Sequence, residues 1–295
     1  MSVDAVLISQ FSDMLHVEAQ QTKSRVMGQV RIQSIKGENF FYDGLNKLGA
    51  RIDNGRNPLS NPQNPQFNRR KMTRSRIIAE VAIDQRDIRD MMSDPKGNLA
   101  VACVSAIHRK VDELGVAAAL ASVGTGVDGS TVVSFASDGG LTINATGGMT
   151  YEILRQISRK FYNREVGLEN GEKLLFLCTA DEHDDLLGEV ELISSDYTSQ
   201  MVVDNGRLAR AFGIDITMFG AAVDSPILPV ASTTRDCIAM SNRGIIYGLS
   251  SDIKVNVIPN HPKYVETDVI QVTMDLGAVR TEGVLVQKVQ TTVKS

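Results

Sequence analysis

The chain has 295 residues, of which 42% are hydrophobic and 22% are charged, and these proportions are typical of a globular protein. Its length allows one large core or two subdomains. Aromatic residues make up only 5% and Trp is absent, which argues against a carbohydrate site or a base-stacking site, because both use aromatic faces.

The net charge of −4 hides an asymmetry along the chain. Residues 1–76 hold 12 Lys and Arg against 6 Asp and Glu, a net charge of +6, whereas the remainder carries a net charge of −10. A basic front end on an acidic body predicts head-to-tail contacts between copies of the chain. The alternative is a basic arm that binds nucleic acid, although its arginines lack interleaved aromatic residues.

The three cysteines, Cys103, Cys178 and Cys237, lie far apart and each sits in an apolar run. We therefore expect buried free thiols and a reducing compartment. The N-terminal residues "MSVDAVLISQFSDML" have neither a positive first region nor a long apolar stretch, so we expect no signal peptide. No run approaches the roughly 18 apolar residues that a membrane span needs, and no membrane partner is expected.

The first unusual segment is residues 36–76, whose middle, "NPLSNPQNPQF", is rich in Pro, Asn and Gln. Proline fixes φ and removes a donor, so neither a helix nor a central strand is expected there. The flanks, Val26–Ile35 and Arg74–Ile83, are predicted strands. In the second, one face is more apolar, because Ile77, Ala79, Val81 and Ile83 alternate with Arg76, Ile78, Glu80 and Ala82. We interpret the segment as a long hairpin with a polar tip, with disorder as the alternative.

One limb of this hairpin carries a basic cluster that we expect to dock on another subunit. Its members are Arg69, Arg70, Lys71, Arg74 and Arg76.

The clearest predicted helix follows in "SDPKGNLAVACVSAIHRKVDELG". Asp94 is the expected N-cap, Pro95 the first helical residue and Gly115 the C-terminal stop. An apolar stripe at helical spacing predicts one buried face; it consists of Leu99, Cys103, Ile107, Val111 and Leu114.

Residues 122–149 are rich in Gly, Ser and Thr and predict short strands and turns. Gly124–Gly129, "GTGVDG", has the spacing of a dinucleotide-binding loop. That loop needs a strand before it and a helix after it, whereas here the order is reversed. We predict no cofactor.

An alternation of helices and strands follows, and it predicts a mixed α+β chain with an α/β module at about 150–258. The expected helices are Thr150–Tyr162, a segment starting at Thr179 and a segment near Gly206–Phe212. The expected strands include residues 173–178, 214–219, 237–240 and 254–258. The chain ends in "DVIQVTMDLGAVRTEGVLVQKVQ", which predicts two strands around a short turn.

Only "DEHDD" at Asp181–Asp185 gathers residue types that bind metals. A zinc site needs several His or Cys, or two His and a carboxylate, whereas this segment has one His. Acidic residues at a helix start are stabilised by the helix dipole alone. We therefore predict no metal site and no catalytic residue, and keep a metal-dependent hydrolase that uses Asp181, His183, Asp184 and Asp185 as an alternative.

The order of these segments resembles the major capsid protein of tailed bacteriophages, the Hong Kong 97-like fold that encapsulin shells share. The most specific segments are "GRLARAFGIDITMFG" at Gly206–Gly220 and the C-terminal strands ending in "LGAVRTEGVLVQKV". The resemblance covers nearly the whole chain and implies a structural protein rather than an enzyme.

The resemblance implies four domains. They are an N-terminal arm at 1–35, an extended E-loop at 36–80, a P-domain at 81–150 and 259–295 with a spine helix at about 95–114, and an A-domain at 150–258.

The resemblance also implies pentamers and hexamers in an icosahedral head, a portal, and double-stranded DNA contacted without sequence specificity. Assembly is expected in the host cytoplasm and the mature protein in the virion. Because the arm-like pattern starts near residue 5, we expect a separate scaffolding protein. Lys47 and Lys71 lie in the E-loop, but no cross-link is predicted. An encapsulin-like compartment and another virion structural protein, such as a tail protein, are the alternatives.

Overall fold

The computed structural model describes residues 20–293 except for several short gaps. These gaps are 53–59, 61, 86–95, 146, 169–170, 190–202, 205–206, 221–226 and 260–265. The chain divides into two compact units. One contains residues 75–111 and 251–276 with the chain before Arg25, and the other contains residues 25–74, 112–250 and 277–295.

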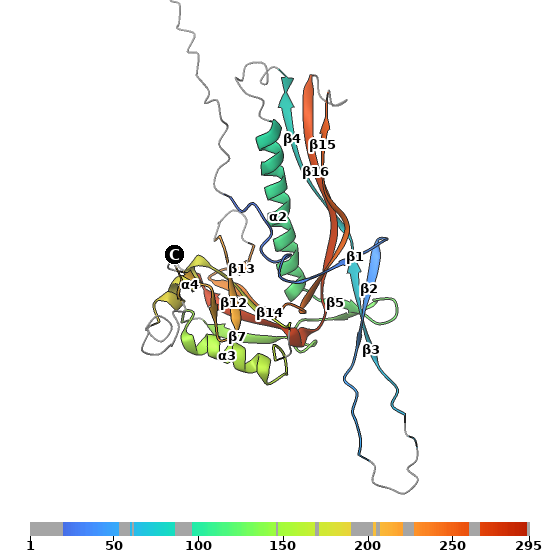
Figure 1. Ribbon diagram of the computed structural model, residues 1–295, viewed down its shortest axis with the longest axis vertical. Coiled ribbons are helices and arrows are strands. Elements are labelled where there is room, and N and C mark those ends of the chain that lie inside the picture. Colours follow the sequence, from blue (N-terminus) through green and yellow to red (C-terminus); the bar gives the residue numbers. More distant parts are fainter. Residues whose placement is uncertain are drawn as a thin grey trace, which may run out of the picture. The chain divides into compact units, whose positions relative to one another are not determined.

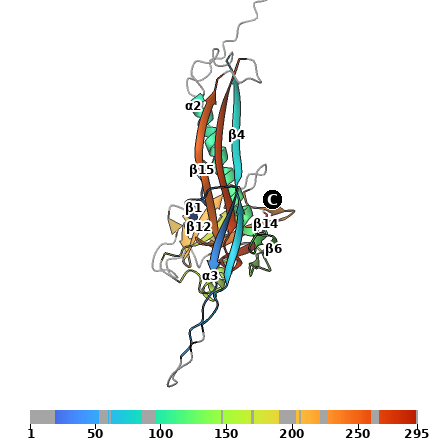
Figure 2. The same ribbon diagram turned by 90° about the vertical axis from the view of Figure 1, so that its right-hand side faces the viewer.

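Parts of long strands and of a long helix build the first unit, while residues 31–34, 112–120, 245–250 and 277–280 of the same elements belong to the second unit. Strand β4 (Ser75–Asp84) pairs antiparallel with β16 (Thr267–Arg280), which neighbours β15 (Ile245–Ile258) in a sheet of order β1-β15-β16-β4, where β1 is Arg31–Ser34. Helix α2 (Lys96–Leu120) runs beside these strands in both views (Figures 1 and 2). In β4 the predicted alternation is confirmed: Ile78, Glu80 and Ala82 are exposed, whereas the residues between and after them are half-buried or buried, namely Ile77, Ala79, Val81 and Ile83.

Helix α2 contradicts one sequence prediction, since it continues past Gly115 to Leu120. A Cβ atom at Gly115 would overlap the buried hydroxyl of Tyr247. Gly115 therefore permits a close approach inside the helix and does not end it. The predicted buried stripe is present, with Cys103, Ile107 and Val111 each less than 5% exposed. The expected cap at Asp94 and Pro95 lies outside the described residues.

The second unit is built on a mixed sheet of order β11-β12-β8-β14-β17-β7, with β13 paired to β14. The strand bounds are Arg210–Ala211 (β11), Ile214–Phe219 (β12), Leu174–Thr179 (β8), Thr234–Ser241 (β14), Val286–Thr292 (β17), Leu141–Ala145 (β7) and Val230–Ala231 (β13). All residues of β8 are buried, as expected for a central strand. Helices α3 (Tyr151–Tyr162) and α4 (Ala180–Leu187) pack on this sheet (Figure 1).

The helix predicted near Gly206–Phe212 is wrong. The segment forms short strands, with β10 (Arg207–Leu208) paired to β9 (Val203–Asp204) and β11 turning back onto β12. Phe212 and Gly213 both have positive φ, 51° and 76°, as a two-residue hairpin turn requires. The segment is too short for helical periodicity to compete with this pairing.

The C-terminal strands are not a hairpin, contrary to the sequence prediction. Strand β16 pairs with β4, whereas β17 pairs with β14 and β7. A single 3₁₀ turn, η1 (Gly283–Leu285), precedes β17. The two strands therefore belong to different sheets.

A small sheet of order β2-β3-β5-β6 completes the second unit. Its strands are Asn39–Leu45 (β2), Phe67–Thr73 (β3), Val123–Thr125 (β5) and Thr131–Val133 (β6). Strands β2 and β3 form a two-stranded ribbon that continues toward residues 46–66 (Figures 1 and 2). The "GTGVDG" stretch forms the turn between β5 and β6, so a strand and not a helix follows it. None of the described helices is long and apolar enough to cross a membrane.

Candidate functional site

The β2–β3 ribbon, with the loop that it carries, exposes apolar side chains. Leu45 and Phe67 face each other across the ribbon and are 56% and 69% exposed. Leu48 and Ile52, farther along the loop, are 58% and 91% exposed. Large apolar side chains grouped on one exposed element are typical of a surface that another protein covers.

The basic cluster predicted as a contact surface is largely paired inside its own chain. Arg69 binds Asp43 through two hydrogen bonds of 2.7 and 3.1 Å, and Arg76 binds Asp275 at 2.8 and 3.2 Å. Arg74 donates to the Oγ atom of Ser250 at 3.2 Å. These bonds direct the guanidinium groups along the sheet surfaces, where Arg69 and Arg76 stay partly accessible.

Two members of the cluster behave differently from the rest. Arg70 is 4% exposed and its Nη2 atom donates to Asp138 at 2.6 Å, so it points inward. Lys71 is half-buried and packs against Gly129. A Cβ atom added to Gly129 would lie 2.6 Å from the Cδ atom of Lys71. Among the described residues Lys71 has no ion-pair partner.

Asp138 joins two buried arginines into a clamp at the foot of the ribbon. Besides Arg70, it accepts a hydrogen bond from the Nε atom of Arg280, which is fully buried, at 3.0 Å. Arg280 also donates to the carbonyl oxygens of Ala119 and Ala121 at 2.8 and 2.7 Å, at the end of α2. Burial lowers the pKa of Arg280, and the Asp138 carboxylate opposes that shift. The clamp therefore ties β3, the end of α2 and the end of β16 together.

A second anchor fastens the chain before β1. The carboxylate of Asp112, buried in α2, accepts hydrogen bonds from the backbone N–H groups of Arg25 and Val26 at 2.9 and 3.1 Å. The Arg25 side chain donates to the carbonyl of Met218 and lies over the ring of Phe219. Residues 25 and 26 are therefore held by their own protomer.

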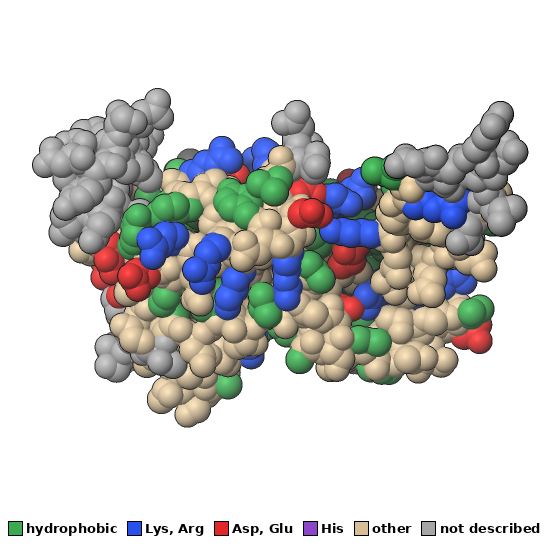
Figure 3. Space-filling view, turned by 90° about the horizontal axis from the view of Figure 1, so that it is seen from below, with side chains coloured by type: hydrophobic (Ala, Val, Ile, Leu, Met, Phe, Trp, Pro, Cys, Tyr) green, Lys and Arg blue, Asp and Glu red, His purple; other side chains and the backbone are tan. Residues whose placement is uncertain are grey.

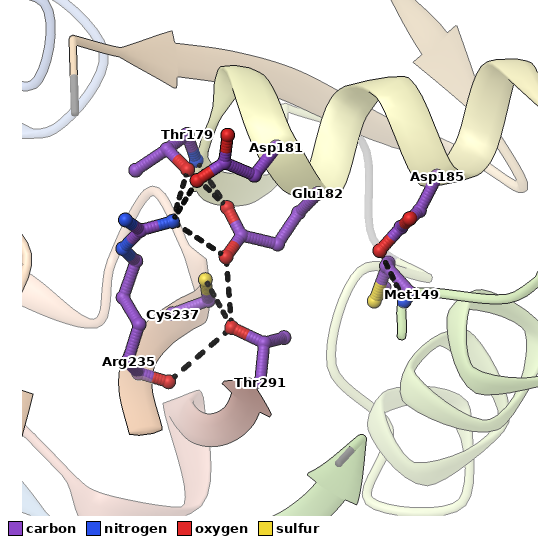
Figure 4. A network of polar contacts seen from close by, with 8 residues as sticks. All are labelled: Met149, Thr179, Asp181, Glu182, Asp185, Arg235, Cys237 and Thr291. Carbon is purple, nitrogen blue, oxygen red and sulfur yellow. Dashed lines mark hydrogen bonds and ion pairs between the residues drawn. The ribbon is translucent and has the colours of Figure 1, made fainter. Parts of the chain in front are cut away.

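The "DEHDD" segment forms part of a buried charge network (Figure 4). Glu182 accepts from both the N–H and the hydroxyl of Thr179, which makes a capping box at the start of α4. Arg235, 5% exposed, donates to Asp181 at 2.8 Å and to Glu182 at 3.1 Å. Thr291 of β17 adds a hydrogen bond of 2.8 Å to Glu182. The network joins α4, β14 and β17.

Burial and these contacts shift the pKa values of Glu182 and His183. Burial would raise the pKa of Glu182, but the hydrogen bonds from Thr179 and Thr291 and the charge of Arg235 outweigh it and lower that pKa. Burial and the nearby charge of Arg207 lower the pKa of His183. The Nε2 atom of His183 accepts a hydrogen bond of 3.0 Å from the backbone N–H of Leu208.

These side chains are engaged in structural contacts. Asp181 and Glu182 bind Arg235, Asp185 accepts from the backbone N–H of Met149 at 3.0 Å (Figure 4), and His183 uses the nitrogen lone pair that a metal would need. Within the described ranges no group of His, Cys, Asp and Glu is arranged to hold a metal ion. The arrangement joins α4 to β14 and β17.

A groove of about 830 Å³ lies where the ribbon meets the segment after α3. Its described lining includes Leu45, Lys47, Leu168 and Glu165. Lys47 and Glu165 form an ion pair of 2.6 Å across it, and their side chains are 84% and 75% exposed. Such an exposed pair is readily exchanged for other partners, because water screens it.

Comparisons with known proteins connect these features to a family. A family model described as "Phage capsid protein" matches residues 3–293. None of the curated protein sequences matches the chain. Among solved structures, the chain is similar to the acid-stable capsid of Helicobacter pylori bacteriophage KHP30, with a TM-score of 0.74 at 9% identity, covering 96% of this chain and 95% of that chain.

Two further capsids show the same likeness. The capsid of cyanophage P-SCSP1u has a TM-score of 0.71 at 10% identity, covering 97% of this chain and 92% of that chain. The capsid of Ralstonia phage GP4 has a TM-score of 0.70 at 10% identity, covering 100% and 98%. These identities show a shared fold, and the family model spans almost the entire sequence. The resemblance found in the sequence is thus confirmed, and the chain belongs to the phage capsid protein family.

Proposed function

We propose that this chain is the major capsid protein of a tailed phage and assembles in many copies into an icosahedral head. The family match over residues 3–293 carries this proposal. The exposed apolar side chains of the ribbon and its loop support it, because Phe67 at 69% and Ile52 at 91% exposure gain by burial against another copy.

In the assembled shell, the ribbon reaches a neighbouring subunit within pentamers and hexamers. Of the basic cluster, Lys71 and the accessible edges of Arg69 and Arg76 are the side chains that meet a neighbour. Arg70 acts inward through Asp138. We also propose that the chain is organised into the N-terminal arm, E-loop, P-domain and A-domain at the boundaries that the resemblance implies.

The proposal extends to the other components of a phage head. A portal and a separate scaffolding protein assist assembly in the host cytoplasm, the virion is the final location, and the packaged double-stranded DNA is contacted without sequence specificity. An encapsulin-like compartment would share the fold, but the family model that matches is one of phage capsid proteins. The role is structural rather than enzymatic.

Removal of the loop tip tests the role of the ribbon. We expect a variant in which an Asn-Gly turn replaces residues 46–66 to fold with an unchanged thermal midpoint, because Leu48 and Ile52 in this stretch are mainly exposed. The same variant should fail to form large particles in sedimentation velocity, whereas the wild-type chain forms them. Normal particles from the shortened chain would contradict the role of the ribbon.

A matched control leaves the ribbon length intact. Lys47→Met breaks only the exposed pair with Glu165. It should change neither folding nor the amount of large particles, so a loss of particles in the shortened chain can be assigned to the missing tip.

A further inference from the structure

Helix α3 carries three neighbouring cations that form no ion pair with the described residues. Arg155 and Arg159 are exposed, and Lys160 is half-buried beside them. They lie four and five residues apart on a helix with 1.5 Å rise per residue, so Arg155 and Arg159 are about 6 Å apart along its axis. Figure 3 shows Lys and Arg side chains gathered in a row on the face seen from below, the side on which α3 lies in Figure 1.

No carboxylate in the described part of the chain neutralises these three cations. The Cζ atom of Arg155 lies 6.0 Å from the centroid of the Tyr151 ring, and neither Arg159 nor Lys160 has an ion pair with any residue that the structure describes. Burial, together with the charges of Arg159 and Arg164, lowers the pKa of Lys160. In a chain with a net charge of −4, three neighbouring cations create a local positive potential that attracts anions.

The helix dipole accounts for only part of the cluster. Arg159 and Lys160 lie in the last turn of α3, where the helix dipole stabilises cations. Arg155 lies one turn earlier, where this effect has faded.

The exposed face of α3 borders a groove. A groove of about 790 Å³ runs along it, and the described lining is Thr150, Glu152, Ile153, Arg155, Gln156 and Arg159. Thr hydroxyl, Gln amide and Arg guanidinium groups are the side-chain donors that most often contact phosphate oxygens and position a protein on DNA. Glu152 is the one carboxylate in the described lining, and it lies at the start of the helix, away from Arg159.

We propose that this face of α3, formed by Arg155, Arg159 and Lys160 with Thr150 and Gln156, binds the phosphate backbone of double-stranded DNA. This inference rests on the proposed function, because the shell encloses the DNA. The contact is independent of sequence, because it is made to phosphate oxygens, which carry no base information. The α3 face supplies local phosphate neutralisation on a chain that is acidic as a whole.

The test compares two triple variants of the full-length protein. In the first, Arg155, Arg159 and Lys160 are each changed to Gln. In the control, the exposed residues Lys36, Lys173 and Lys254 are each changed to Gln. Both variants lose the same net charge, and Gln has nearly the helix propensity of Arg and Lys.

Binding to a labelled duplex of about 30 base pairs is measured by fluorescence anisotropy between about 50 and 200 mM salt, the range over which phosphate contacts dominate affinity. Each lost phosphate contact reduces the slope of log K against log salt by about 0.9. We expect the α3 variant to lose about 2.7 in slope, and the control to keep the wild-type slope. The single variants Arg155→Gln and Arg159→Gln should each lose about 0.9, which keeps the test valid if the triple variant does not fold.

Three outcomes would overturn the proposal. One is a wild-type slope in the α3 variant, and another is an equal loss in the control, which would mean diffuse attraction. The third is a wild-type slope combined with a failure to form shells, which would assign the face to a contact with a second copy. Shell formation by the wild-type chain is scored separately, so failure of the proposed function is distinguishable from failure of this inference.

Discussion

Gly115 and Tyr247 are in contact within the core of the second unit, where the glycine leaves room for a buried phenol. The contact explains why a glycine is retained inside a helix, although glycine there costs about 1 kcal/mol relative to alanine. At this position packing outweighs helix propensity.

Substitution of this glycine provides a stability prediction. Gly115→Ala should destabilise the chain by about 1–3 kcal/mol through overpacking against Tyr247, despite the gain in helix propensity. Gly97→Ala is the control in the same helix, because a Cβ atom there meets nothing within 4 Å. It should leave stability unchanged or raise it by up to about 1 kcal/mol. Denaturant unfolding measures both, and a neutral Gly115→Ala would refute the packing argument.

The buried network of α4 predicts how stability depends on pH. The pKa of His183 is lowered from 6.5, so the unfolded chain binds a proton that the folded chain does not. The free energy of unfolding should therefore be highest above pH 6.5 and fall as the pH decreases toward the folded pKa. The lowered pKa of Glu182 acts in the same direction at lower pH, since its contribution is present above 4.5 and is lost as the pH falls further.

His183→Gln separates the two contributions. The Gln amide oxygen can still accept the hydrogen bond from Leu208, but it does not titrate. Arg207 and Asp184, the charged groups that influence His183, stay in place. Chemical unfolding should show a smaller decline just below pH 6.5 in the variant and the same decline below pH 4.5. An equal decline just below pH 6.5 would assign that loss to another group.

Several elements follow directly from local sequence pattern. The apolar stripe of α2 and the alternation of β4 are confirmed, because each is set by burial on one face. The three cysteines are buried and free, as predicted. The Asp181–Asp185 segment begins a capped helix, as the acidic residues in its first turn indicated.

Features that depend on distant partners were not accessible from local pattern. Arg70 was predicted as a surface cation, and only the fold brings it to Asp138, 68 positions away. Arg235 meets Glu182 across 53 positions. The two C-terminal strands have a hairpin-like sequence, yet each finds a better partner in a different sheet. Pairing between strands is decided by the whole core, which a short window does not contain.

The clamp at the foot of the ribbon gives a prediction for one element. Asp138→Asn leaves Arg70 and Arg280 buried beside each other without a carboxylate. Breaking such a buried pair costs about 3–5 kcal/mol, and we expect a correspondingly lower thermal midpoint. Asp43→Asn, on the same ribbon, removes only the partly exposed pair with Arg69 and should change the midpoint little. Similar midpoints for the two variants would show that the clamp is not an anchor.

For the whole molecule, the charge asymmetry of the sequence predicts contacts between copies. Part of the positive charge is neutralised by ion pairs within the protomer. Arg69, Arg70 and Arg76 of the basic front end pair with Asp43, Asp138 and Asp275. Among the described residues, the apolar side chains of the ribbon and its loop and the cations of α3 stay exposed. We therefore propose that assembly depends mainly on the burial of apolar side chains and that DNA contact depends on local positive charge.

Electron microscopy of the purified wild-type protein tests the central claim most directly. Incubated at increasing concentration, the chain should form closed, uniform shells with pentameric and hexameric clusters on their surface. A protein that stays monomeric or forms only small rings at every concentration, with a folded β2–β3 ribbon, would contradict its role as the building block of a phage head.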